Sequence, residues 1–306
     1  MTGKVSVIIP SRNEQFLPRT VADILAKAAG EIEVIAVLDG YWPTDGDNHL
    51  LLPDDKRLHI IHRGEPRGMR AAINAAAGIA TGDFLMKTDA HCMFAEGFDE
   101  TLKADCEDNW IVVPRRYSLD AELWERRPKE PIDYHYLDCP MTNPEYFQFH
   151  GVVWNQRGRE RRDDPQYDID DTMSWQGSMW FMSRKHWDWL GGMSEEGYGT
   201  FSQEPQEIGL KTQLGGGRLV VNKKTWYAHL HKGKQYGRGY SVSKGGIVAG
   251  HKYSAEYWMS NSWPDRVHDV EWLIERYWPV PRWPDNWMEL LEEWRVGHAG
   301  LYRAEV

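Results

Sequence analysis

The chain has 306 residues, enough to bury a full hydrophobic core in one large α/β domain or in one domain with an appendage. Its 46 Asp and Glu residues outnumber its 36 Lys and Arg residues, and the net charge of −10 disfavours nonspecific binding of a polyanion across the whole surface. The three cysteines, Cys92, Cys106 and Cys139, form no CxxC pair, which gives no support to redox chemistry and argues against a disulfide framework.

The N-terminal stretch "MTGKVSVIIPSRNE" enters a strand pattern within a few residues and lacks the apolar core of a signal peptide. The sequence contains no apolar run long enough to span a bilayer. These patterns predict a soluble, cytoplasmic protein with no membrane segment.

The N-terminal third alternates between strand and helix patterns. Short β-branched runs predict strands at residues 5–10, 31–40 and 57–63, and apolar residues at helical spacing predict helices at residues 18–27 and 69–80. A further strand pattern begins at "FLMK". This alternation predicts an α/β fold with a mostly parallel central sheet covered by helices on both faces.

Polar side chains follow the ends of these predicted strands. They are Asn13, Glu14, Asp39, Asp89 and His91. Each of them is also an ordinary turn residue. Because ligands of open parallel sheets bind beyond the carboxyl ends of the strands, five polar groups at that edge predict a binding site.

Asp89 and His91 in "FLMKTDAHCMF" are two metal-capable residues separated by one alanine. In an extended chain, residues i and i+2 point to the same side, so both side chains could reach one cation. The spacing permits a metal site without proving one, because Asp and His near strand ends more often serve as turn and hydrogen-bonding residues.

Five blocks of the sequence together resemble a known family. They are "VSVIIPSRNE", "VIAVLDG", "RGMRAAINAAAGIATGDFLMKTDAHC", "GSMWFMSRKHWDWLGGMSEE" and "FSQEPQEIGLKTQLGGGRLVVNKKTWYAHLHK". They resemble the nucleotide-sugar domain of GT-A glycosyltransferases, and the match is closest to family 2 and to the polypeptide N-acetylgalactosaminyltransferases, which share an Asp-x-His-Cys signature. The resemblance implies a Rossmann-like GT-A domain at residues 1–250, with residues 119–171 as a candidate acceptor-side insertion.

This resemblance implies transfer of a hexosyl or N-acetylhexosaminyl group from a nucleotide-sugar donor, expected to be a UDP-sugar, to an acceptor hydroxyl. The diphosphate leaving group needs a divalent cation, Mn²⁺ or Mg²⁺. In the resembling enzymes a histidine after the last core strand completes the metal site, and "TWYAHLHK" offers His229 beside Asp89 and His91. Asp89 also counts among the donor-binding residues, and His231 is a competing ligand. Mixed oxygen and nitrogen ligands suit manganese better than calcium.

Several residues would bind the nucleotide by resemblance. Asp39 would accept a hydrogen bond from the uracil imide, and Pro10, Arg12 and Glu14 would line the same base and ribose pocket. Arg70 in "RGMRAAIN" matches a basic residue that family members direct at the nucleotide. Its alternative is a solvated arginine at the start of a helix.

The stretch "SQEPQEIGLK" corresponds by resemblance to the acceptor-side motif, and it supplies two candidate catalytic carboxylates, Glu204 and Glu207. The helix dipole alone also explains acidic residues in this first turn, and it suffices for Glu207. Pro205 stands where many family 2 enzymes carry the aspartate that serves as base, so Glu204 is the best remaining carboxylate and the stereochemistry is open.

After His229, "HKGKQYGRGYSVSKGG" mixes glycines with basic residues. It is either a flexible surface loop or a lid over the diphosphate, with Lys232 and Tyr236 as the expected contacts and Lys232 counted among the catalytic residues. Upstream, the charged segment "RGRERRDDPQYDIDD" is either mobile over the acceptor site or a solvated linker.

The C-terminal residues 251–306 hold much of the total of 16 Trp and are predicted to form a helical extension. Most of these rings should pack against the main domain, and exposed ones would suit sugar stacking or a homo-oligomer interface. The acceptor remains open between a glycan, a protein side chain and a modified nucleic-acid base. A non-catalytic carbohydrate-binding protein on the same scaffold is a further alternative.

Overall fold

The computed structural model describes residues 3–40, 51–143, 145 and 147–298. Within them, the strands of the main sheet are β1 (Val5–Ser11), β2 (Ile32–Asp39), β3 (Leu58–Arg63), β4 (Phe84–Thr88), β5 (Cys92–Phe94), β6 (Trp110–Asp120), β7 (Glu125–Arg126), β10 (Ile169–Asp171), β11 (Met179–Ser183) and β12 (Arg218–His229). β8 (His135–Leu137) and β9 (Gly151–Val153) form a separate antiparallel pair.

The helices are α1 (Leu17–Lys27), α2 (Met69–Ile79), α3 (Phe98–Ala104), α4 (Asn155–Arg161), α5 (Arg184–Leu190), α6 (Glu204–Leu214), α7 (Gly233–Tyr236), α8 (Lys244–Met259), α9 (Val270–Tyr277) and α10 (Trp287–His298). Two short 3₁₀ turns, η1 (Pro140–Thr142) and η3 (Pro165–Tyr167), lie in the middle of the chain. None of the helices in the described ranges is long and apolar enough to cross a membrane.

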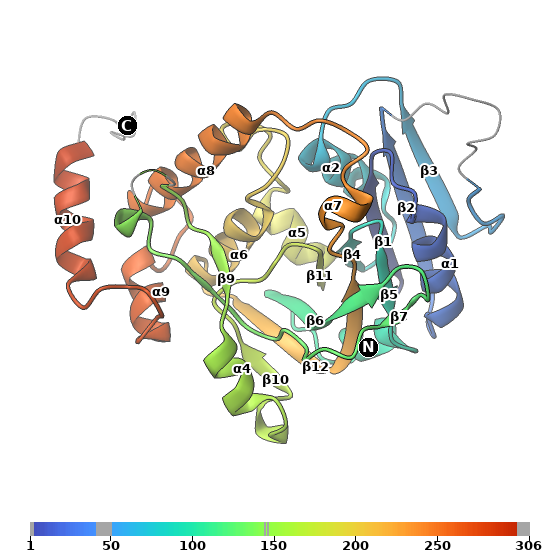
Figure 1. The fold of residues 1–306 in the computed structure, drawn as a ribbon, viewed down its shortest axis with the longest axis horizontal. Helices are drawn as coiled ribbons and strands as arrows, with labels where there is room; N and C mark the ends of the chain where they lie inside the picture. Colours follow the sequence, from blue (N-terminus) through green and yellow to red (C-terminus); the bar gives the residue numbers. More distant parts are fainter. Residues whose placement is uncertain (1–2, 41–50, 144, 146, 299–306) are drawn as a thin grey trace.

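The strand order of the main sheet is β10-β12-β6-β11-β4-β1-β2-β3, with β5 and β7 attached to β12 and β6 (Figure 1). β1 pairs in parallel with β2 and β4, and β2 pairs in parallel with β3. β11 runs antiparallel between β4 and β6. The prediction of a mostly parallel α/β sheet is therefore confirmed. Because β1 aligns Ser11 with Leu38, the turns after β1 and β2 emerge at the same edge.

Helices cover both faces of this sheet. Alternate strand residues point to opposite sides, and both sets are apolar, so each face packs against helices. Val7 and Ile9 of β1 belong to one hydrophobic core, shared with α1 and α3. Ile8, between them, belongs to a second core, shared with α2, α5 and α6. The buried sheet thus holds its carboxyl edge rigidly in place.

The charged segment in the middle of the chain is folded. It forms α4, η3 and β10, and β10 adds to the edge of the main sheet beside β12. Arg161 Nη1 donates to Asp170 Oδ2 over 2.7 Å, and Arg162 Nη2 donates to Glu130 Oε2 over 2.9 Å. These contacts favour a structured insertion over a solvated linker, and its acceptor-side role stays a prediction.

The tryptophan-rich C-terminal residues form helices, as predicted. α9 and α10 lie at the opposite end of the molecule from β1, β2 and β3 (Figure 1). Trp258, Trp263 and Trp287 are buried in a hydrophobic cluster that also contains Leu210 and Leu214 of α6. The predicted boundary between residues 250 and 251 falls inside α8, and the division into two domains stays a prediction.

Candidate active site

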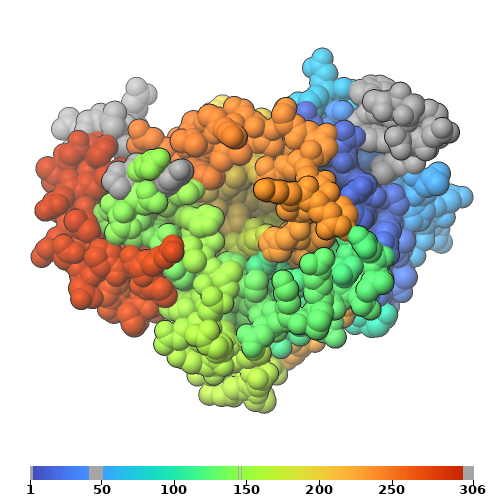
Figure 2. Space-filling model, viewed as in Figure 1, coloured from blue at the N-terminus to red at the C-terminus, as the bar shows by residue number. Residues whose placement is uncertain are grey.

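A cavity of about 780 Å³ opens at the carboxyl edge of the sheet. The space-filling view shows the surface hollowed beside the orange segment that carries α7 and the start of α8 (Figure 2). The predicted site residues that line this cavity are Pro10, Arg12, Glu14, Asp39, Asp89, His91, Glu204, His229 and Lys232. Arg70, Glu207 and Tyr236 are absent from its lining among the described residues.

Asp89, His91 and His229 converge as the resemblance implied, because β5 and β12 pair so that Cys92 lies opposite His229. His229 Nε2 lies 3.2 Å from Asp89 Oδ2 and 3.2 Å from His91 Nε2. His91 Nε2 lies 3.9 Å from Asp89 Oδ2. Bonds of roughly 2.0–2.2 Å to one ion would place ligand atoms about 3 Å apart, so the three atoms fit one cation.

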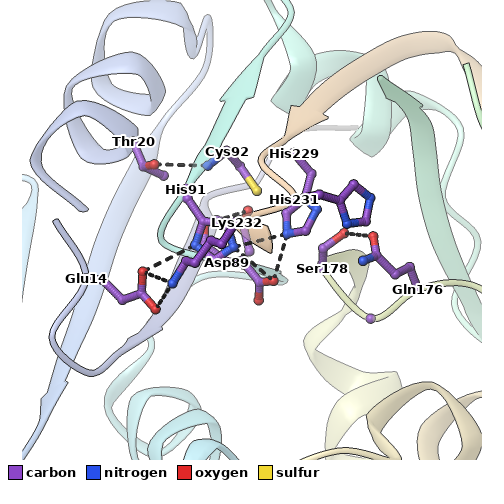
Figure 3. Close-up of polar contacts among 12 residues, drawn as sticks. Glu14, Thr20, Asp89, His91, Cys92, Gln176, Ser178, His229, His231 and Lys232 are labelled. Atoms are coloured by element: carbon purple, nitrogen blue, oxygen red, sulfur yellow. Dashed lines mark hydrogen bonds and ion pairs between the residues drawn. The ribbon is translucent and has the colours of Figure 1, made fainter. Parts of the chain in front are cut away.

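The chemistry of the donor set also fits a metal. His91 Nδ1 lies 3.4 Å from Glu14 Oε2, which favours a proton on Nδ1 and leaves Nε2 free as a ligand (Figure 3). Burial lowers the pKa of His229 to about 3, although its hydrogen bond with Asp89 opposes this shift, so the ring is neutral. Burial acts to raise the pKa of Asp89, but Lys87 and the two histidines outweigh it and hold that pKa below its ordinary range.

Lys87 supports this group from inside the protein, and the sequence prediction missed it. Its side chain is 1 % exposed, and Nζ donates to Asp89 Oδ1 over 2.9 Å, to Glu204 Oε2 over 3.0 Å and to the Gly177 carbonyl over 2.7 Å. These acceptors use all three ammonium protons. Burial acts to lower the pKa of Lys87, but Asp89 and Glu204 raise it above its usual value. The lysine therefore stays charged between two carboxylates.

Glu204 lies at the first turn of α6, where Pro205 occupies the predicted position in the first turn. Burial raises the pKa of Glu204. One carboxylate oxygen accepts from Lys87 and the other accepts from Trp180 Nε1. Both oxygens are thus engaged in a buried network at the cavity wall.

Asp39 ends β2 at the opposite side of the cavity and is 3 % exposed. Oδ1 accepts from the Arg67 backbone N–H over 2.9 Å and from Arg63 Nη1 over 3.2 Å, and Oδ2 accepts from the Gly68 backbone N–H over 2.7 Å. A carboxylate offers about four lone-pair sites, so one acceptor site remains for a ligand.

Arg70 and Glu207 form a buried ion pair behind the cavity wall. Arg70 also donates to the Ser194 carbonyl over 2.9 Å, and Glu207 Oε1 accepts from the Ser194 backbone N–H over 2.8 Å and from Lys211 Nζ over 3.0 Å. The pair joins α2 to α6. Both side chains therefore stabilise the packing of the two helices, and neither lines the cavity.

The segment after β12 covers part of the cavity. Lys232 Nζ pairs with Glu14 (Figure 3), whereas Tyr236 Oη donates to Glu122 Oε1 over 3.3 Å and its ring packs edge-on against Phe16. His231, the competing metal ligand of the sequence prediction, lies outside the group of three. Of the two predicted lid contacts, only Lys232 faces the cavity.

Comparison with known proteins agrees with this geometry. The profile of glycosyl transferase family 2 matches residues 6–189, which is more than half of the chain. The chain belongs to this family.

Individual relatives share about a quarter of the aligned residues with this chain. The chain is 26% identical over 267 residues to polypeptide N-acetylgalactosaminyltransferase 3 of Mus musculus, across 83% of this chain and 41% of the relative. It is 27% identical over 124 residues to glycosyltransferase GlyG of Streptococcus pneumoniae serotype 4, across 39% of this chain and 41% of the relative. The chain thus spans less than half the length of these relatives.

Solved structures share the fold. The crystal structure of GalNAc-T7 with UDP, GalNAc and Mn²⁺ superposes with a TM-score of 0.67 at 17% identity, covering 90% of this chain and 56% of that one. S. aureus TarS 1–349 in complex with UDP-GlcNAc superposes with a TM-score of 0.53 at 16% identity, covering 99% of this chain and 74% of that one. These likenesses confirm the predicted GT-A fold.

Proposed function

We propose that this family 2 protein is a metal-dependent glycosyltransferase that moves a sugar from a UDP-linked donor to an acceptor hydroxyl. The observation that carries the proposal is the convergence of Asp89, His91 and His229 in a cavity of about 780 Å³ at the carboxyl edge of the sheet. The complexes of the two superposed structures with UDP, GalNAc and Mn²⁺ or with UDP-GlcNAc support a UDP-sugar with an N-acetylhexosamine.

Asp89, His91 and His229 would hold Mn²⁺ or Mg²⁺, which neutralises the charge of a diphosphate leaving group when it is bound. Lys232 lies beside this group, paired with Glu14, and is proposed to donate to the diphosphate.

Asp39 is proposed to accept from the uracil imide through its remaining lone pair, with Pro10 and Arg12 lining the same end of the cavity. Glu204 is the proposed acceptor-side carboxylate. Lys87 and Trp180 each donate to one of its oxygens, and the remaining lone pairs are proposed to hold the sugar or to activate the acceptor hydroxyl.

The proposal is tested by hydrolysis of UDP-GalNAc and UDP-GlcNAc, with release of UDP as the readout. We expect hydrolysis with Mn²⁺, none with excess chelator, and a loss of about a hundredfold in Asp89→Asn, as for one lost charge-stabilising contact. Asp83→Asn is the matched control, because Asp83 directly precedes β4 at its other end and its side chain accepts from the Lys4 backbone N–H. Equal rates in chelator, or in Asp89→Asn, would contradict the proposal. Metal and UDP binding without any turnover would favour the non-catalytic alternative.

A further inference from the structure

Arg116 on β6 is a buried cation without a carboxylate partner among the described residues. The residue is 5 % exposed, and it forms none of the ion pairs in this part of the chain. Its Nη1 donates to Gln176 Oε1 and lies 3.0 Å from His231 Nε2, and its Nε is buried without any hydrogen-bond partner. Buried charges in folded proteins are normally paired, so an unpaired guanidinium here calls for an anion from elsewhere.

Arg116 fixes the orientation of two cavity-lining side chains. A guanidinium only donates hydrogen bonds, so Gln176 must turn its oxygen, and His231 its unprotonated Nε2, toward Arg116. The amide group of Gln176 and the Nδ1–H of His231 are then left to donate elsewhere. Both side chains are exposed and line the cavity. The arrangement presents two donors, backed by one buried positive charge.

In the described part of the cavity that Gln176 and His231 line, no carboxylate lacks a cationic partner. Its acidic lining residues are Glu14, Asp39, Asp89 and Glu204, each of which already pairs with a cationic side chain. The cavity lining also includes His150 and His251, whose rings can donate further hydrogen bonds. Neither of them lies on β1 or β2, the strands that end at the predicted base pocket.

We propose that Arg116, Gln176 and His231 form a subsite for an oxyanion of the acceptor, a carboxylate or a phosphate close to the hydroxyl that receives the sugar. This inference rests on the proposed function, because it assigns the diphosphate of the donor to the metal side and the second anion to the acceptor. It deepens that function by naming an anionic acceptor. Arg116 acts as a positioning residue through Gln176 and His231.

The test is calorimetric titration of acetate and of inorganic phosphate into the protein preloaded with Mg²⁺ and UDP. We expect saturable binding of at least one anion, weakened about tenfold or more in Arg116→Met and in Gln176→Leu, as for one charge-assisted contact. Stronger binding of phosphate would identify a phosphorylated acceptor, and stronger binding of acetate a carboxylated one. Arg127→Met is the matched control, because Arg127 lies on the surface beside Asp120 and should leave anion binding unchanged.

UDP affinity is measured in the same samples, so failure of the proposed function can be told apart from failure of the proposed anion subsite. Absence of anion binding in protein that binds UDP would overturn the subsite, as would unchanged anion affinity in Gln176→Leu. Because the Gln176 side chain is exposed, a loss of anion affinity in that variant is not explained by a disrupted core. A loss of UDP affinity in Arg116→Met with unchanged anion affinity would instead assign Arg116 to the donor. If UDP itself does not bind, the proposed function fails, and the titrations in the unloaded protein still decide the subsite.

Discussion

Lys87 joins Asp89, a proposed metal ligand, to Glu204, the proposed acceptor-side carboxylate, through one ammonium group. It holds Asp89 Oδ1, which leaves Oδ2 directed at the two histidines, and it holds Glu204 at the start of α6. A change at either carboxylate is therefore transmitted to the other. Removal of the lysine would leave the buried carboxylate of Glu204 close to the partly exposed carboxylate of Asp89 without a cation between them.

We expect Lys87→Met to weaken Mn²⁺ binding by about tenfold or more, because Asp89 loses the donor that orients it. The double variant Lys87→Met with Glu204→Gln removes the repulsion between Glu204 and Asp89, so it should recover thermal stability without recovering Mn²⁺ affinity. Electron paramagnetic resonance of free Mn²⁺ and thermal unfolding measure the two effects. Wild-type Mn²⁺ affinity in the single variant would mean that Lys87 serves packing alone.

The sequence could predict the three candidate metal ligands but not Lys87. Asp89 and His91 are visible from their spacing, and His229 from resemblance. A lysine in a strand is usually read as solvent-facing, although its position two residues before Asp89 places it on the same side of the chain. The resemblance places Arg70 and Glu207 in the site, and no sequence pattern shows that two residues so far apart form a buried pair.

The segment between α7 and α8, residues 237–243, lies against the end of β1. Asn13 Nδ2 donates to the Gly239 carbonyl over 2.9 Å, and the Arg12 guanidinium stacks 5.0 Å from the centre of the Tyr240 ring. A Cβ at Gly239 would lie 2.8 Å from the Asn13 Cβ, so this close approach requires glycine. These contacts are few, and no buried apolar side chain anchors residues 237–243. Such a segment can open at low cost.

We predict that residues 232–246, which include this segment, close over bound donor, because Lys232 can pair with the diphosphate only when the donor is present. Trypsin should cleave at the exposed Arg238 or Lys244 quickly in the free protein and slowly with UDP and Mn²⁺ together. UDP alone and Mn²⁺ alone should protect little. Equal cleavage rates in all four conditions would show that the segment is a surface loop without a closing role.

The parallel half of the sheet could be predicted from the sequence, whereas the half formed by β10, β12 and β6 could not. β1, β2 and β4 are mostly apolar and are buried almost throughout, which is the pattern of strands covered on both faces. The order of β10, β12 and β6 depends on contacts between distant segments, and a three-residue strand such as β10 has no periodicity to detect. The C-terminal helices were visible from composition, but their burial against α6 was not.

Two buried histidines outside the proposed metal group contribute to a pH dependence of folding stability. Burial lowers the pKa of His135 to about 3 and that of His186 to about 4. In the unfolded chain both would titrate near pH 6.5, so the unfolded state binds more protons as the pH falls below that value. Stability should therefore decrease from pH 7 to pH 5, by up to about 1.4 kcal/mol per pH unit for each histidine.

Denaturant unfolding at pH 7 and pH 5 measures this effect. His186→Gln should show a shallower dependence on pH, because one of the two histidines no longer titrates. His59→Gln, at an exposed site on β3, should keep the wild-type dependence. The same pH dependence in all three proteins would contradict the assignment to buried histidines.

Calorimetric titration should show that wild-type protein binds UDP with Mn²⁺ and that chelator or His229→Ala weakens this binding about tenfold or more, while the variant keeps its thermal stability without metal. Equal UDP affinity in the wild type with Mn²⁺, the wild type with chelator and His229→Ala would contradict metal-dependent binding of UDP.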